Sequence, residues 1–208
     1  SEELIAEALH PYPKGLVIAT KGGLIRPGPD DWRADCRPEH LKAACEGSLK
    51  RLKLDRIDLY QLHTVDRRVK LEESLGALVR LQEEGKIRHI GVSNFDADEL
   101  KRARKVAAIV SVQNHYNIGA RDDDAIVDLC AKQGMAFIPW APLGSGRLAA
   151  AARRHQTSPA QVALAWLLAR SPAMLPIPGT ASLAHFEENM GATDLHLTAR
   201  ELEEIARG

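Results

Sequence analysis

Short apolar runs rich in β-branched residues alternate along the chain with longer segments of helical periodicity. The runs are Leu16–Thr20, Ile57–Leu62, Ile87–Val92, Ala108–Val112, Ala136–Trp140 and Met174–Ile177. They are apolar on both faces or nearly so, which is typical of strands in a parallel sheet covered on both sides. The pattern therefore predicts six strands.

The segments between these runs predict amphipathic helices, and residues with known start and stop preferences mark their ends. The signals are Pro38 ahead of Leu41–Leu52, Gly85 after the stripe Leu71–Val79, Asp96 with Glu99, Gly134 after Ile126–Cys130, Ser158 with Pro159, and Thr198 with Glu201. Asp, Ser and Thr cap helix N-termini, Glu three residues later completes a capping box, and Gly ends a helix. A helix is predicted between each pair of neighbouring strands.

This alternation predicts a parallel sheet with right-handed crossovers, which either closes into a barrel or stays open. No GxGxxG pattern follows the first strand, which counts against the dinucleotide-binding open sheet. We therefore expect an α/β protein with a (β/α)8 barrel, of which six of the eight strands lie in this chain. Residues 1–208 are expected to form a single barrel domain, with the first two β/α units upstream of Ser1.

Composition narrows the class of protein. Lys plus Arg and Asp plus Glu both number 28, so no excess charge favours nucleic acid or an anionic membrane as partner. Three widely spaced cysteines indicate reduced thiols, and no apolar run approaches the roughly 20 residues that span a bilayer. The acidic start Ser1-Glu2-Glu3 is unlike a signal peptide. A cytoplasmic protein of unknown oligomeric state is expected.

Polar side chains follow the predicted strands at their carboxyl ends, where barrels carry their chemistry. A desolvated Lys21 can lower the pKa of a neighbouring acid or act as a Schiff-base nucleophile, whereas an isolated lysine more often extends to water. His63, taken alone, can equally be a hydrogen-bonded core histidine. Because the two residues end adjacent strands, they form a pair that a chance arrangement seldom offers.

Six segments match, in order, the sequence motifs of one enzyme family. They are Ile18–Lys21, Asp55–His63, Gly85–Phe95, Val112–Asn114, Trp140–Gly144 and Ile177–Thr180, the last followed by Glu188-Asn189. Through them the chain resembles the aldo-keto reductases, which are nicotinamide-dependent carbonyl reductases with a (β/α)8 barrel. The resemblance implies reduction of a small aldehyde or ketone to an alcohol, with NADPH as cofactor.

The resemblance also implies a role for each matching residue. Lys21 would tune a tyrosine proton donor, and His63 would orient and polarise the substrate carbonyl. The nicotinamide would be held by Ser93, Asn94 and Gln113 through its carboxamide and by Trp140 through ring stacking. The rest of the cofactor would contact Ala141, Leu143, Gly144, Ser145, Arg147, Gly179, Thr180, Ser182, His185, Glu188 and Asn189. Among these, Thr180 and Ser182 open a short helix whose N-terminus suits a phosphate.

Two catalytic residues of the family have no counterpart among these motifs. The resemblance places its aspartate at the end of strand two and its tyrosine just before the helix Ser1–Leu9, so both are expected upstream of Ser1. A longer family loop is expected near Arg147–Arg153.

The three tyrosines of the chain do not replace the missing one. Tyr12 precedes its strand, so it is expected at the opposite end of the barrel. Tyr60 is expected to point away from His63 because strand side chains alternate. Tyr116 is expected to pack a loop.

The cofactor motif also departs from the family. Many members bind the 2′-phosphate of NADPH with a lysine and an arginine at the positions that Gly179 and His185 occupy here. Histidine is a weaker phosphate ligand than the fixed guanidinium of arginine. NADPH is still expected, with NADH as the alternative.

The remaining polar residues suggest no metal site. His63 and Asp66 lack a third ligand nearby, and Asp122–Asp124 suits a helix N-terminus better than magnesium. His89, His115, His155 and His196 are interpreted as surface or helix-end residues. The alternatives to a reductase are a non-catalytic NADPH-binding module, similar to potassium-channel β-subunits, and a metal-dependent or Schiff-base barrel enzyme.

Overall fold

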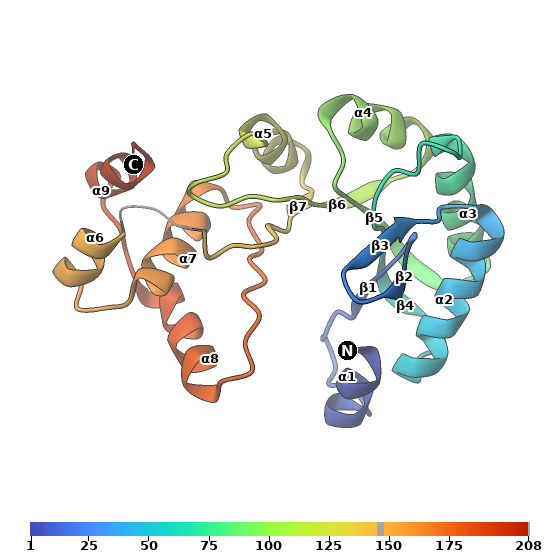
Figure 1. Ribbon diagram of the computed structural model, residues 1–208, viewed down its shortest axis with the longest axis horizontal. Coiled ribbons are helices and arrows are strands. Elements are labelled where there is room, and N and C mark those ends of the chain that lie inside the picture. Colours follow the sequence, from blue (N-terminus) through green and yellow to red (C-terminus); the bar gives the residue numbers. More distant parts are fainter. Residues whose placement is uncertain (145–147, 208) are drawn as a thin grey trace. The chain divides into compact units, whose positions relative to one another are not determined.

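The computed structural model describes residues 1–144 and 148–207, which divide into two compact units, Ser1–Val112 and Gln113–Gly208. The elements are labelled in Figure 1. The first unit contains α1 (Glu2–Leu9), β1 (Ala19–Gly22), β2 (Leu24–Gly28), β3 (Asp31–Ala34), α2 (Pro38–Leu52), β4 (Ile57–Leu62), α3 (Leu71–Glu83), β5 (Ile87–Ser93), α4 (Ala97–Val106) and most of β6 (Ile109–Gln113).

The first unit is a parallel sheet covered by helices. Its strands are hydrogen-bonded in the order β1-β4-β5-β6, and both β1–β4 and β4–β5 are parallel. Helices α2, α3 and α4 lie side by side along one face (Figure 1). Strand β4 is almost wholly buried. Burial of each of its large apolar side chains stabilises the fold by about 1.5–3 kcal/mol. The sheet therefore holds the carboxyl ends of its strands at one edge.

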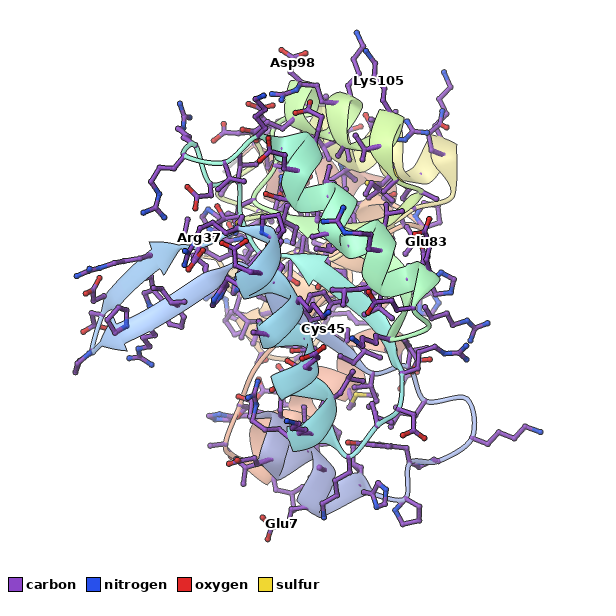
Figure 2. The ribbon with its side chains drawn as sticks, turned by 90° about the vertical axis from the view of Figure 1, so that its right-hand side faces the viewer. Glu7, Arg37, Cys45, Glu83, Asp98 and Lys105 are labelled. Carbon is purple, nitrogen blue, oxygen red and sulfur yellow. The ribbon has the colours of Figure 1, made fainter. Side chains whose placement is uncertain are left out.

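A hairpin of β2 and β3 was not predicted from the sequence. The strands are antiparallel, and the backbone N–H of Asp35 closes the base of the hairpin by donating to the carbonyl of Gly23. The hairpin extends outward past Arg37, which precedes α2 (Figure 2). Its strands show no regular apolar alternation, and Trp32 is exposed, so the hydrophobic pattern carried no signal for them.

The second unit is mainly helical in its described residues. It contains α5 (Asp124–Gln133), β7 (Ala136–Phe137), α6 (Ala149–Arg154), α7 (Pro159–Arg170), α8 (Leu183–Met190), the 3-10 helix η1 (Gly191–Asp194) and α9 (Ala199–Ala206). Its core forms around α7, where the indole of Trp166 stacks on Tyr116 and the ring of Tyr116 meets Phe137 edge-on.

Two predicted strands were too long. Ala136–Trp140 is a strand only over its first two residues, and Met174–Ile177 makes a single parallel bridge, between Phe137 and Met174. Each segment contains a proline, Pro139 or Pro176, which cannot donate to a strand ladder. The first strand also begins later than predicted, at Ala19.

The predicted helix ends are confirmed. Capping boxes form at Asp96 with Glu99, at Ser158 with Gln161, and at Thr198 with Glu201. Helix α5 ends at Gly134 with φ of 67°. All three cysteines are buried free thiols, as expected. No described helix is both long and apolar enough to cross a bilayer.

Candidate active site

Lys21 and His63 lie on one face of the sheet, at neighbouring strand ends. Lys21 pairs in register with Gln61, and the backbone N–H of His63 donates to the carbonyl of Gly22 at 2.9 Å. Because side chains alternate along a strand, Lys21, Gln61 and His63 point to the same side of the sheet. The structure thus brings together the two residues predicted to be catalytic.

Burial controls the charge of this pair. Burial and, to a smaller extent, the positive charge of Lys21 together lower the pKa of His63 to about 4. Burial also lowers the pKa of Lys21 from its usual value. The imidazole is therefore neutral near pH 7 and can donate one hydrogen bond to an oxygen atom, while the ammonium beside it attracts negative charge.

The end of β5 adjoins His63. The amide of Asn94 donates to the backbone carbonyl of His63 at 3.0 Å and to the hydroxyl of Ser93 at 3.2 Å. Asn94 has φ of 58°, a left-handed conformation that asparagine tolerates better than most residues, and Ser93 is buried. Ser93 and Asn94 are thereby fixed next to His63.

A buried hydrogen bond between strands β4 and β6 was not predicted from the sequence. The amide of Gln61 donates to the hydroxyl of Ser111 at 3.4 Å, and both side chains are buried. A Cβ atom on Gly91 would overlap that hydroxyl and lie 2.9 Å from Cγ of Gln61. Gly91 thus leaves room for this hydrogen bond. Its place in the middle of the motif Gly85–Phe95 was the one sequence signal for it.

In the second unit, Gln113 is buried and Trp140 is partly exposed. The indole of Trp140 stacks on the imidazole of His115, with ring centroids 4.3 Å apart and planes inclined by 21°. His115 is exposed, as predicted, but the contact with Trp140 was not foreseen.

Four of the predicted cofactor residues surround one cavity of about 340 Å³. They are Ala141, Leu143, Gly144 and Gly179, and the lining also includes Asn117, Pro142, Ile177 and Pro178. A Cβ atom on Gly144 would overlap the amide of Asn117, so the segment packs closely on that side chain. Ser145 and Arg147 were also predicted to bind the cofactor, and they lie outside the described residues.

The predicted adenosine-phosphate segment forms a helix start. Ser182 caps α8 by accepting from the backbone N–H of His185 at 3.4 Å, and the hydroxyl of Thr180 accepts from the N–H of Ser182 at 3.0 Å. His185 is exposed, and Glu188 and Asn189 are half-buried near the end of the same helix. The helix predicted at this position is confirmed.

Tyr12 and Tyr60 lie as expected, whereas Tyr116 packs in the core of the second unit against Phe137 and Trp166 and not against a loop. Tyr12 donates to the carbonyl of Leu52, at the end of α2, with an oxygen separation of 2.7 Å. Tyr60 is fully buried, and burial raises its pKa far above the usual value. Tyr116 is also fully buried and donates to the carboxylate of Asp124 at 2.5 Å.

Metal ligands do not gather in the described part of the chain, where no group of three His, Cys, Asp or Glu residues could hold an ion. The carboxylate of Asp66 is occupied by the guanidinium of Arg68 at 2.9 Å and by the N–H of Cys36 at 3.3 Å. Asp123 and Asp124 begin α5, as predicted.

Comparison with known proteins gives a consistent result. The model of the "Aldo/keto reductase family" matches residues 1–154 and 147–207. An uncharacterized oxidoreductase of Schizosaccharomyces pombe is 43% identical over 206 residues, which are 96% of this chain and 67% of that protein. Pyridoxine 4-dehydrogenase of Escherichia coli is 41% identical over 210 residues, covering 95% of this chain and 73% of the enzyme.

Solved structures agree with these matches. A thermostable aldo-keto reductase in complex with the inhibitor epalrestat superimposes with a TM-score of 0.87 at 31% identity, over 99% of this chain and 76% of that one. An aldo-keto reductase from Klebsiella pneumoniae in complex with NADPH gives a TM-score of 0.84 at 28% identity, over 99% and 74%. The predicted α/β fold with the parallel arrangement of a (β/α)8 barrel is confirmed. The chain belongs to the aldo/keto reductase family of oxidoreductases.

Proposed function

We propose that the protein uses NADPH to reduce aldehydes or ketones to alcohols. The observation that carries the proposal is the pair of Lys21 and His63, in which a neutral imidazole stands beside a partly desolvated ammonium. Reduction of a carbonyl places negative charge on its oxygen, so a hydrogen-bond donor and a cation directed at that oxygen stabilise the transition state.

In this proposal His63 orients the substrate by donating a hydrogen bond to the carbonyl oxygen. Its low pKa suits that role, because a neutral imidazole donates without releasing a full proton near pH 7. Lys21 lowers the pKa of the acid that delivers the proton to the same oxygen. His63 thus polarises the substrate carbonyl, and Lys21 assists the protonation of its oxygen.

The residues present fit a nicotinamide cofactor, which when bound supplies the hydride. A cavity of about 340 Å³ is lined by Ala141–Gly144 and Gly179, and Trp140 presents an indole that is 38% exposed, so a planar ring can stack on it. Ser93, Asn94 and Gln113 carry the kinds of donor and acceptor group that a carboxamide pairs with. Ser145 and Arg147 are proposed to contact the pyrophosphate.

The choice between NADPH and NADH depends on the residues that would contact the 2′-phosphate. His185 and Gly179 stand where many relatives carry cations for the 2′-phosphate, so a modest preference is expected. The NADPH complex of the Klebsiella relative supports NADPH as the cofactor. NADH remains the alternative within the proposal.

A second candidate is a non-catalytic NADPH-binding module. This candidate predicts cofactor binding without turnover.

The test is a fluorescence titration of the purified protein with NADPH and NADH, followed by NADPH consumption with 4-nitrobenzaldehyde. Binding with turnover supports the reductase, and His63→Gln should then lower kcat about 10²- to 10⁴-fold while leaving cofactor affinity nearly unchanged. Binding without turnover favours the module. Absence of binding by both cofactors would contradict the proposal.

A further inference from the structure

The backbone around Trp140 is tied to the segment that follows β6. The N–H of Trp140 donates to the carbonyl of Asn114 at 3.0 Å, and the N–H of Tyr116 donates to the carbonyl of Trp140 at 3.4 Å. These bonds form a parallel bridge between His115 and Trp140 and hold the two residues side by side. The stacked rings described above follow from this pairing.

Asn117 fixes the next peptide along the same segment. Its amide donates to the carbonyl of Ala141 at 2.9 Å, while its side-chain oxygen accepts from the N–H of Gly119 at 2.9 Å. The amide nitrogen also lies 3.4 Å from Nε2 of His115. Asn117 is 5% exposed, so these contacts are shielded from water. One side chain thereby links His115 to Ala141.

Ala141 needs such support. Its φ of 50° lies in the left-handed region, which is costly for a residue with a Cβ atom and persists only where the surroundings enforce it. The hydrogen bond from Asn117 to the carbonyl of Ala141 is one such restraint. The conformation of Ala141 sets the direction in which the chain leaves Trp140 toward the cavity residues Leu143 and Gly144.

We propose that His115 and Asn117 form a clamp that positions Trp140 for the nicotinamide ring. The inference rests on the proposed function, and it assigns His115 and Asn117 as positioning residues rather than catalytic ones. An exposed indole must be ordered before a second ring can stack on it, and ordering costs binding free energy. The imidazole covers one face of the indole in advance, while 38% of Trp140 stays exposed.

His115 is suited to a test because its side chain is exposed and its loss removes little from the core. An aromatic pair of this kind corresponds to about 3- to 10-fold in affinity. We expect His115→Ala to raise the Kd for NADPH by about that factor, with a matching rise in KM for the cofactor. His115→Phe keeps a flat ring at the position and should restore most of the affinity. His196→Ala, at another exposed histidine, is the control.

A double-mutant cycle shows whether the effect passes through the indole. In a Trp140→Leu background, His115→Ala should change the Kd for NADPH no further, because the ring that it positions is absent. An equal effect of His115→Ala with and without Trp140 would overturn the proposal. Wild-type affinity of His115→Ala would overturn it as well.

A readout without cofactor separates the clamp from the proposed function. His115→Ala should change the tryptophan emission of the free protein, and the change should vanish in the Trp140→Leu background. If the protein binds neither NADPH nor NADH, the proposed function fails, yet the emission still tests the stack. Identical emission of wild type and His115→Ala would overturn the clamp whatever the cofactor titration gives.

Discussion

At the scale of single residues, the charge of His63 responds to two neighbours that act in the same direction. Burial is the larger cause of its low pKa and the positive charge of Lys21 is the smaller one. Replacing Lys21 with methionine keeps most of the side-chain volume and removes the charge. We expect Lys21→Met to raise the pKa of His63 above about 4, but not to the unperturbed value of about 6.5, because burial remains.

The measurement is the pH dependence of the imidazole proton shifts by NMR. Lys14→Met is the matched control, since Lys14 is exposed. An unchanged pKa in Lys21→Met would mean that the ammonium does not reach the imidazole. A return to about 6.5 would mean that burial is not the main cause.

The hydroxyl of Tyr60 gives a second prediction at this scale. It is buried without a hydrogen-bond partner among the described residues, and it lies against Gly22. An unsatisfied buried hydroxyl is destabilising, so Tyr60→Phe should raise the free energy of unfolding by about 1 kcal/mol. Gly22→Ala should lower it, because the new Cβ would overlap that hydroxyl.

Denaturant unfolding of the wild type, the two single variants and the double variant tests this pair of changes. In the Tyr60→Phe background the penalty of Gly22→Ala should shrink, since part of the overlap is gone. A loss of stability in Tyr60→Phe would show that the hydroxyl has a partner in solution.

At the scale of elements, the capping box of α7 makes a local contribution that can be measured. The hydroxyl of Ser158 accepts from the N–H of Gln161 at 3.2 Å. Ser158→Ala removes this acceptor and should lower the free energy of unfolding by about 1 kcal/mol, whereas Ser158→Gly should cost only a few tenths. Equal losses in the two variants would indicate that the cap is not the source of the effect. Thermal unfolding of both, compared with wild type, gives the answer.

Local signals of this kind explain which elements the sequence predicts well. The strand Ile57–Leu62 and the helices that begin at capping boxes depend on residues close together in the chain, and they were found nearly to the residue. The strands predicted at Ala136–Trp140 and Met174–Ile177 are shorter in the structure, because Pro139 and Pro176 lack the backbone N–H that a strand ladder needs. The β2–β3 hairpin lacks apolar alternation and was missed.

The residues of the candidate site likewise differ in how well the sequence predicts them. Lys21, His63 and Asn94 follow from the rule that chemistry lies at the carboxyl ends of parallel strands. The stack of His115 on Trp140 and the bond from Asn117 to Ala141 join residues more than twenty positions apart. No periodicity encodes such contacts, although His115 and Asn117 closely follow the matched motif Val112–Asn114.

At the scale of the whole molecule, several shifted pKa values make stability depend on pH. Hydrogen bonds from Arg68 lower the pKa of Asp66 to about 2, and hydrogen bonds led by the backbone of Thr198 lower that of Glu201 to about 2. Both are depressed below the unfolded value, so their stabilisation is present above about pH 4–5 and is lost as pH falls toward 2. His63 is neutral in the folded protein, so its protonation favours the unfolded chain as pH falls from about 6.5 to 4.

The buried thiols limit stability on the alkaline side. Burial raises the pKa of Cys36 to about 12 and that of Cys45 to about 11, so the folded protein holds two protons that the unfolded chain releases above about pH 8.5. Stabilisation from these protons is complete below about pH 8.5 and is lost as pH rises toward 12. We therefore expect the urea midpoint to be highest between about pH 6.5 and 8.5, where neither set of groups titrates. His63→Gln should flatten the decline between pH 6.5 and 4, and Cys45→Ala should flatten the alkaline decline. A midpoint that stays constant from pH 6.5 to 4 in wild type would mean that the imidazole can be protonated without unfolding.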